Sequence, residues 1–198
     1  MFHNPALSAG LAMSALVSTV MMATLVVGPF YLSRALGLDT ALVGIAMSAG
    51  PLVAALTGIP AGRIVDRVGA QGMTIAGLIG IATGCFTLSV MPARLGIAGY
   101  LGPIMVITAS YALFQAANNT AMMADARPDQ RGVISGMLNL SRNLGLITGA
   151  SVMGAVFVAG GMRITFEVAA ILIVVALAVA ILSMPFAGAH GVRHNHAP

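Results

Sequence analysis

The sequence predicts an all-α membrane protein with six transmembrane helices, and three observations lead to this fold class. Of the 198 residues, 59% are apolar and 7% are charged, whereas a soluble globular domain is about one-quarter charged. The mean hydropathy is +0.99. The few charged residues are spaced so that they leave six long charge-free stretches. A soluble enzyme domain would need more polar surface, and a disordered chain would carry more charge.

The charge-free stretches place the six helices in order. A helix needs about 20 mostly apolar residues to cross the hydrocarbon core of a bilayer. The expected spans lie near 8–32, 41–61, 72–91, 98–123, 132–159 and 167–186. Together they would form one six-helix bundle over residues 1–186, followed by a disordered cytoplasmic tail, 187–198.

The arginines predict the orientation of these spans in the lipid bilayer. Five of them fall on one side of the layout, namely Arg63, Arg67, Arg127, Arg131 and Arg193. Three fall on the other side, namely Arg34, Arg94 and Arg163. Cytoplasmic loops carry the excess of basic residues, so both termini are expected in the cytoplasm, in a bacterial inner membrane. The net charge of +4 is then explained by arginines that orient the spans in the membrane, and no nucleic-acid partner is expected.

The acidic residues argue against both an enzyme and a self-contained proton pump. All five lie at expected loops or helix ends, namely Asp39, Asp66, Asp125, Asp129 and Glu167. A buried carboxylate is the usual proton carrier in a membrane pump, and this chain offers none at mid-membrane. A nucleophile–base pair or a set of metal ligands is likewise missing from the spans. The histidines near the C-terminus are assigned to the tail, so no enzyme, cofactor or metal site is expected.

Polar residues inside the fourth and fifth spans form a candidate transport pathway. In the fifth span, Ser135, Asn139, Arg142 and Asn143 share one helical stripe about 100° wide. In the fourth span, Gln115, Asn118 and Asn119 lie at i, i+3 and i+4. Folding the chain about Arg127 brings Gln115 opposite Asn139. Two alternatives remain, which are interhelical hydrogen bonds of about 0.6 kcal/mol each and snorkelling of Arg142 to the headgroups.

Small residues four apart indicate where helices approach each other closely. The fifth span carries two such pairs, Gly132–Gly136 and Gly145–Gly149. The second span has Gly44–Ser48 and Gly58–Gly62 at the same spacing. Because such pairs let helix backbones come together, both spans are expected to pack tightly against other helices.

Two segments resemble known sequence patterns. The stretch from Gly62 to Gly69, with Asp66 and Arg67 inside it, resembles the GxxxDRxG signature of the major facilitator superfamily. That signature lies in the cytoplasmic loop after the second span of each half, and Ala70 and Gln71 replace the two basic residues that usually follow. The stretch from Phe114 through Arg131–Gly132 to the Arg142 region is similar to the late helices of the fourteen-span drug:proton antiporters.

This resemblance implies a fold and a function. The family builds twelve or fourteen spans from six-helix halves, each a 3+3 inverted repeat, around a midplane site. This chain resembles the C-terminal half of a proton-coupled multidrug or small-molecule efflux transporter. The resemblance implies a cytoplasmic gating motif at Gly62, Asp66, Arg67 and Gly69. It also implies a small lipophilic substrate, and as partner either a missing N-terminal half or a second copy of the chain. The alternatives are a six-span structural or assembly protein and an inactive transporter fragment.

Overall fold

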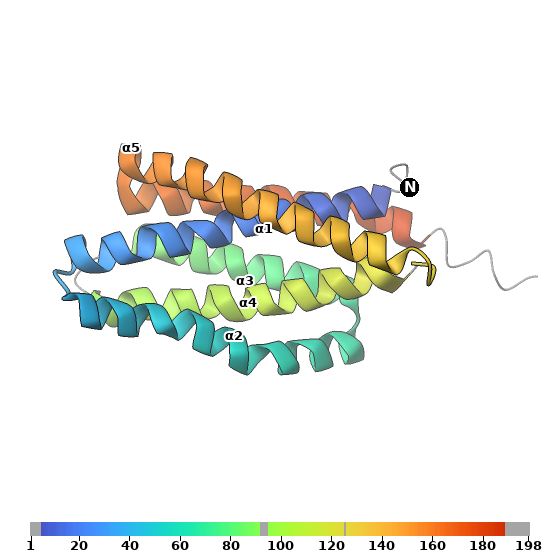
Figure 1. The fold of residues 1–198 in the computed structure, drawn as a ribbon, viewed down its shortest axis with the longest axis horizontal. Helices are drawn as coiled ribbons and strands as arrows, with labels where there is room; N and C mark the ends of the chain where they lie inside the picture. Colours follow the sequence, from blue (N-terminus) through green and yellow to red (C-terminus); the bar gives the residue numbers. More distant parts are fainter. Residues whose placement is uncertain (1–4, 92–94, 125, 189–198) are drawn as a thin grey trace, which may run out of the picture.

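The protein is a bundle of long helices that run side by side (Figure 1). The computed structural model describes residues 5–91, 95–124 and 126–188. The elements in chain order are α1 (Pro5–Phe30), a π-helical turn η1 (Tyr31–Ala35), α2 (Thr40–Val68), α3 (Ala70–Val90), α4 (Gly96–Ala124) and α5 (Arg131–Gly188). Five of these helical stretches are long and apolar enough to cross a membrane. The expected all-α class is therefore confirmed for the described residues.

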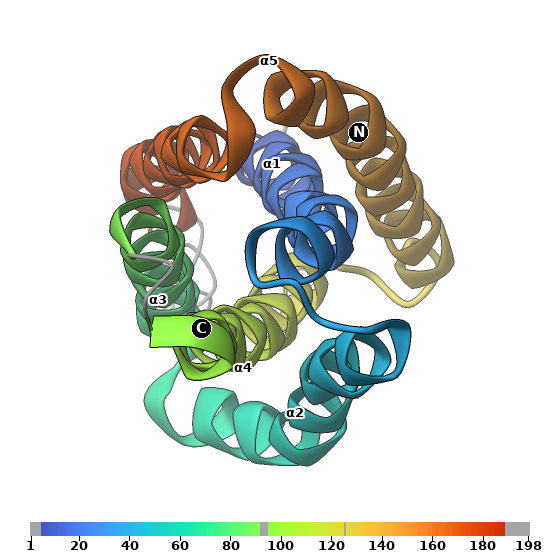
Figure 2. The same ribbon diagram turned by 90° about the vertical axis from the view of Figure 1, so that its left-hand side faces the viewer.

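The helix α5 is two helical segments joined at Gly161. The backbone there has φ 71° and ψ −168°, a conformation that glycine adopts without steric cost. Figure 2 shows that the chain doubles back at this point, so the two parts of α5 run back along the bundle on either side of α1. We call them the first part (131–160) and the second part (162–188). The sequence predicts the sixth span from 167, but the helix resumes directly after Gly161, because a single glycine completes the reversal.

Two other boundaries differ from the sequence prediction. The second span is expected to end at 61, yet α2 continues to Val68. Arg63, Asp66 and Arg67 therefore lie in the last turns of α2 and not in a loop. A charge ends an apolar run, but it does not interrupt the hydrogen bonds of a helix. At the C-terminus, α5 reaches Gly188, which makes the start of the expected tail helical; the rest of the tail, 189–198, lies outside the described residues.

The core of the bundle forms around α1. Val17, Val20 and Val27 of α1 are fully buried, as are Leu78 of α3 and Ile173 of the second part of α5. These side chains belong to one continuous apolar cluster. A smaller cluster joins Met122, Ile134 and Leu138 at the end of the bundle where α4 leads into α5. In contrast, α2 has few buried side chains, and it lies at the edge of the bundle in Figure 2.

Glycines set the closest helix contacts. A Cβ atom on Gly149 would lie 2.6 Å from the carbonyl oxygen of Thr19 in α1, and one on Gly145 would meet the carbonyl of Ala15. A Cβ on Gly77 of α3 would lie 2.8 Å from the backbone nitrogen of Phe114 in α4. Because the neighbouring atoms belong to helix backbones, they cannot move aside easily. The α1–α5 and α3–α4 contacts therefore depend on these glycines.

We expect Gly149→Ala to destabilise the bundle by about 1–3 kcal/mol, the usual cost of overpacking a core. The matched control is Gly136→Ala, because a Cβ there meets no atom within 4 Å and alanine favours a helix by up to about 1 kcal/mol. The measurement is thermal unfolding of the purified chain in detergent. Equal melting temperatures for the two variants would show that α1 and the first part of α5 do not pack as described.

Candidate functional site

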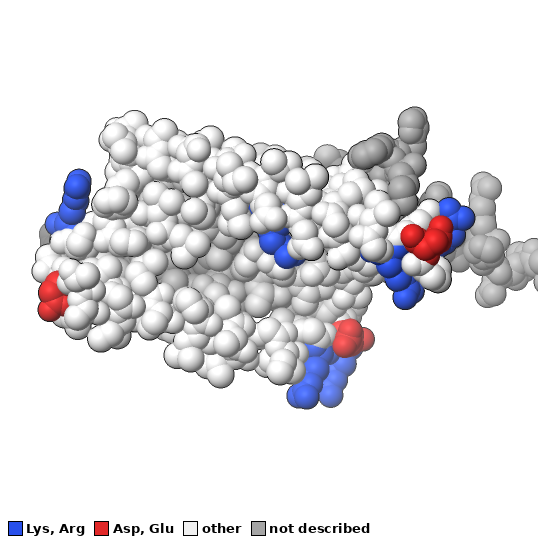
Figure 3. Space-filling view, in the orientation of Figure 1, with Lys and Arg blue, Asp and Glu red and all other residues white. Residues whose placement is uncertain are grey.

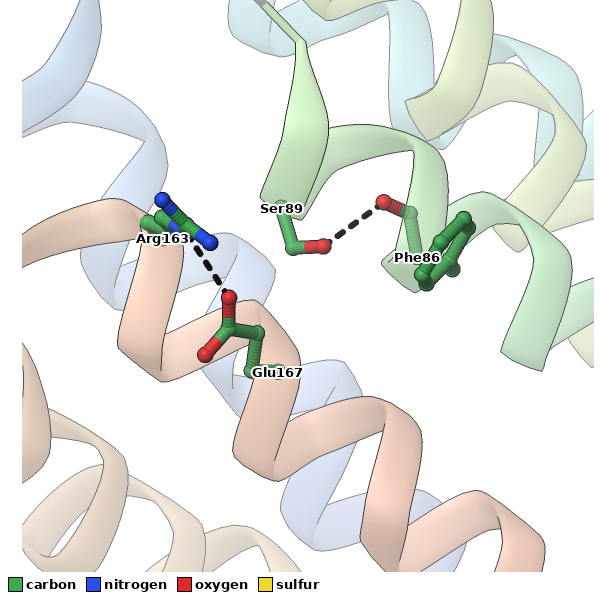
Figure 4. A network of polar contacts seen from close by, with 4 residues as sticks. All are labelled: Phe86, Ser89, Arg163 and Glu167. Carbon is green, nitrogen blue, oxygen red and sulfur yellow. Dashed lines mark hydrogen bonds and ion pairs between the residues drawn. The ribbon is translucent and has the colours of Figure 1, made fainter.

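Charged side chains gather at the two ends of the bundle, and some basic atoms also lie part way along it (Figure 3). At one end, Arg163 donates to Glu167 at 2.8 Å, one helical turn away, close to the end of α3 (Figure 4). At the other end, Arg127 and Asp129 lie 4.0 Å apart and are both exposed. Exposed pairs of this kind contribute little to stability. Among the described residues, no group of His, Cys, Asp and Glu is arranged to hold a metal ion.

The expected gating motif spans the junction of α2 and α3. Gly62 and Arg67 lie in the last turns of α2, and Gly69 separates the two helices with φ 103°. This positive φ explains why a glycine is needed there. Its N–H donates to the carbonyl of Val65 at 2.9 Å, and its carbonyl accepts from Met73. The Asp66 side chain is exposed and makes no ion pair with any described residue.

The side chain of Asn118 joins α4 to α1. It is 3% exposed, and its amide nitrogen donates to the carbonyl of Gly10 at 3.2 Å and to the hydroxyl of Ser14 at 2.9 Å. Both amide hydrogens are used in this way. Gln115 and Asn119 are half-buried and make no hydrogen bond with the described residues. Of the three candidate pathway residues of α4, Asn118 therefore acts in helix packing.

Two further hydrogen bonds join α1 to the first part of α5. The hydroxyl of Ser141 donates to the carbonyl of Leu11 at 2.6 Å. The hydroxyl of Thr19 contacts the carbonyl of Gly145 and that of Ala15 in its own helix, both at 3.0 Å. The sequence does not predict either of these two hydrogen bonds. The available signal was the density of Ser and Thr in α1, which indicates an inner helix but does not identify the partners.

The polar stripe of α5 lies beside the face that packs on α1. Ser135, Asn139 and Asn143 are exposed, and Arg142 is half-buried. The expected juxtaposition of Gln115 and Asn139 stays a prediction; α1 packs closely against α5, whereas α4 makes few contacts with it. A short loop brings the ends of two helices together, but a third helix can separate them over the rest of their length.

The first part of α5 and α2 expose apolar surface with little cover. Large exposed side chains are Ile45, Leu52, Leu56 and Ile59 of α2, and Leu140, Leu144 and Ile147 of α5. A Cβ would meet nothing within 4 Å at Gly44, Gly58, Gly62, Gly132 or Gly136. These glycines, unlike Gly145 and Gly149, are not used for packing within the described chain. We call this surface of α2 and the first part of α5 the uncovered face.

A separate hollow of about 430 Å³ lies between α3 and α4. Its lining is apolar, with small residues such as Gly84, Gly99 and Gly102. The hydroxyls of Thr83 and Thr87, which also line it, donate to carbonyls of their own helix at 2.8 and 2.7 Å. The hollow therefore offers no charged group to a ligand.

The chain resembles transporters of known sequence. It is 32% identical over 154 residues to the uncharacterized transporter YebQ of Escherichia coli, a match that covers 76% of this chain and 34% of YebQ. It is 23% identical over 129 residues to the riboflavin transporter RibZ of Clostridioides difficile, covering 65% of this chain and 28% of RibZ. The matched region thus spans about a third of the length of these relatives.

Solved transporter structures share the fold. A peptide transporter POT in complex with sulfate superposes with a TM-score of 0.85 at 20% identity, over 93% of this chain and 38% of that one. The POT family transporter PepTSo gives a TM-score of 0.77 at 15% identity, over 98% of this chain and 39% of that one.

The sequence model of the Major Facilitator Superfamily matches residues 10–196, nearly the whole chain. Together with the apolar helices, this match identifies an integral, multi-pass membrane protein. The chain belongs to the Major Facilitator Superfamily.

Proposed function

We propose that this chain is the C-terminal, six-span half of a proton-coupled efflux transporter for small lipophilic molecules, in the drug:proton antiporter branch. Family membership supports the transporter class. One observation supports the assignment to one half of a longer protein, because the chain aligns with about a third of each relative. A six-helix half is also consistent with the coverage of 38% of the POT chain. The reversal of α5 at Gly161 supports six crossings, and their 3+3 arrangement is part of this proposal.

The uncovered face is the surface that meets the second half. Its glycines lack neighbours within the chain, and small residues in membrane helices are typical of close helix contacts. Its large side chains are exposed over the length of both helices. A six-span half on its own would leave one wall of a central pathway open to lipid. The partner is therefore either a missing N-terminal half or a second copy.

Within this half, the candidate pathway residues are Gln115, Asn119, Ser135, Asn139, Arg142 and Asn143. Asn118 is better explained as a helix contact, because its amide hydrogens are already bonded to α1. The described acidic residues lie at helix ends, so a proton-carrying carboxylate would come from the other half. Asp66, in the last turn of α2, is proposed to gate the cytoplasmic side and not to contact substrate.

A second candidate function is a six-span structural or assembly protein of the membrane. The glycine contacts and the apolar helices serve such a role equally well. The polar stripe of α5 favours a transporter, because a packing role needs no exposed Ser, Asn and half-buried Arg on one helical face. Binding of lipophilic cations by the complete protein would separate the two functions.

For the transport function, we expect no substrate-dependent proton flux from proteoliposomes that hold the purified monomeric chain. The physical reason is that half of a two-sided pathway cannot alternate between its openings. The complete protein should show such flux, and its Asp66→Asn variant should lose flux while binding substrate with nearly unchanged affinity. Robust flux from verified monomers of this chain would contradict the half-transporter proposal.

The orientation predicts that both termini lie in the cytoplasm. A reporter enzyme that is active only in the periplasm should stay silent when it is fused after Pro198. A reporter inserted in the loop between η1 and α2, at Leu38, should be active in the same cells, and it provides the positive control. Activity of the C-terminal fusion would reverse the assigned sides of the membrane.

Asn118 and Asn119 differ in a way that separates packing from substrate contact. We expect Asn118→Leu to destabilise the protein by about 0.6–1.7 kcal/mol, the range for hydrogen bonds between membrane helices, because α1 loses its contact at Gly10 and Ser14. Asn119→Leu should change stability less and substrate affinity more. The measurements are thermal unfolding and equilibrium substrate binding. If Asn118→Leu lost substrate affinity without losing stability, Asn118 would be assigned to substrate contact and not to helix packing.

A further inference from the structure

Arg142 carries a charge inside a membrane helix, and its side chain has no partner among the described residues. It lies roughly 16 Å along the helix from Arg131. Its side chain is half-buried, and it makes no hydrogen bond and no ion pair with any residue that the structure describes. Arginines within membrane spans almost always face the protein interior or a wet cavity and pair with another group. The described part of the chain therefore lacks the group that would balance this charge.

The missing group has to come from the side of the uncovered face. Ser135, Asn139 and Asn143 are exposed on the same stripe as Arg142, while the neighbouring stripe, with Leu138 and Gly145, packs on α1. Lipid tails cannot accept hydrogen bonds from any of these polar groups. The apolar surface beside them is broad, and its glycines have room for another helix. A protein helix is therefore the occupant that suits both the polar stripe and its surroundings.

The described residues of a second copy of this chain do not supply the balancing charge. Its described acidic residues lie at the ends of helices: Asp39 caps α2, Asp66 is in the last turn of α2, Asp129 precedes α5, and Glu167 pairs with Arg163. In a two-fold dimer the two copies keep the same depth in the bilayer, so each Arg142 would meet groups of its own depth. An inverted copy also leaves these carboxylates near the membrane surfaces. Neither arrangement brings a described carboxylate to Arg142.

We propose that Arg142 forms an ion pair with an Asp or Glu that the second half carries on a helix at mid-membrane depth, so that the second half differs in sequence from this chain. This inference rests on the proposed two-half architecture. A guanidinium can bind a carboxylate through two parallel hydrogen bonds, which fixes both the depth and the rotation of the partner helix. Arg142 is then a positioning residue for the contact between the halves, and its exposed Asn neighbours complete the polar contact.

The test uses three synthetic membrane helices of Leu and Ala as probes for the chain in lipid vesicles. The first carries one Asp at its midpoint, the second carries Asn there, and the third carries the Asp two turns nearer one end. Association is measured by energy transfer from a dye on Asp129→Cys in a Cys85→Ala background. We expect the mid-Asp helix to bind about tenfold more tightly than the Asn helix, and the shifted Asp helix to lose most of that advantage. Arg142→Leu and Arg142→Gln should abolish the difference, and Arg142→Lys should keep only part of it.

Several results would overturn the inference. Equal binding of the Asp and Asn helices would mean that Arg142 is satisfied by the headgroups. Energy transfer between two copies of the chain that disappears in Arg142→Leu would make the second copy the partner. Binding of decanoate that requires Arg142, without selectivity for the Asp helix, would assign the site to a small anion. In each of these cases, substrate-dependent proton flux by the complete protein would leave the proposed transport function intact, and its absence would refute that function separately.

Discussion

The bundle depends on the close, hydrogen-bonded contact between α1 and the helices around it. In hydrocarbon, burying apolar side chains between helices brings no hydrophobic gain, so association relies on fit and on interhelical hydrogen bonds. α1 has both. Glycines 145 and 149 let its backbone approach α5, and Ser141 and Asn118 donate hydrogen bonds to its carbonyls from α5 and α4. The positions of α3 and of the second part of α5 follow from the apolar cluster that α1 shares with them.

The contact of α1 with α4 and α5 also determines which polar residues of those helices do not bond to α1. Asn118 and Ser141 are committed to α1, although both come from the helices that carry the candidate pathway. Arg142 follows Ser141 directly in sequence and therefore projects from a different side of the helix. Packing thus divides one polar region of the sequence into groups that hold the bundle together and groups that face outwards, toward the uncovered face.

The class of fold and most of the helices could be predicted from the sequence, because charge-free length is a direct requirement of the bilayer. The end of α2 could not, since the charges of Arg63 and Asp66 limit the apolar run but not the helix. The pairing of Gln115 with Asn139 stays a prediction, and the short loop alone does not reveal that α1 packs more extensively on α5 than α4 does. Likewise, glycine spacing alone does not distinguish Gly145, which touches α1, from Gly136, which touches nothing within 4 Å. That distinction requires the rotation of each helix about its axis.

The reversal at Gly161 has a consequence for how the chain assembles. Since one residue joins the two parts of α5, their ends meet with little loss of chain entropy, and this helical hairpin can form as soon as both parts are in the bilayer. The bond from Thr19 to Gly145, by contrast, joins residues 126 positions apart, so α1 has to remain in the lipid until the first part of α5 has been made. The hydroxyl of Thr19 also reaches Ala15 in its own helix, and that of Thr24 reaches Met21. These local bonds give α1 a way to satisfy its hydroxyls during biosynthesis, before the first part of α5 is present.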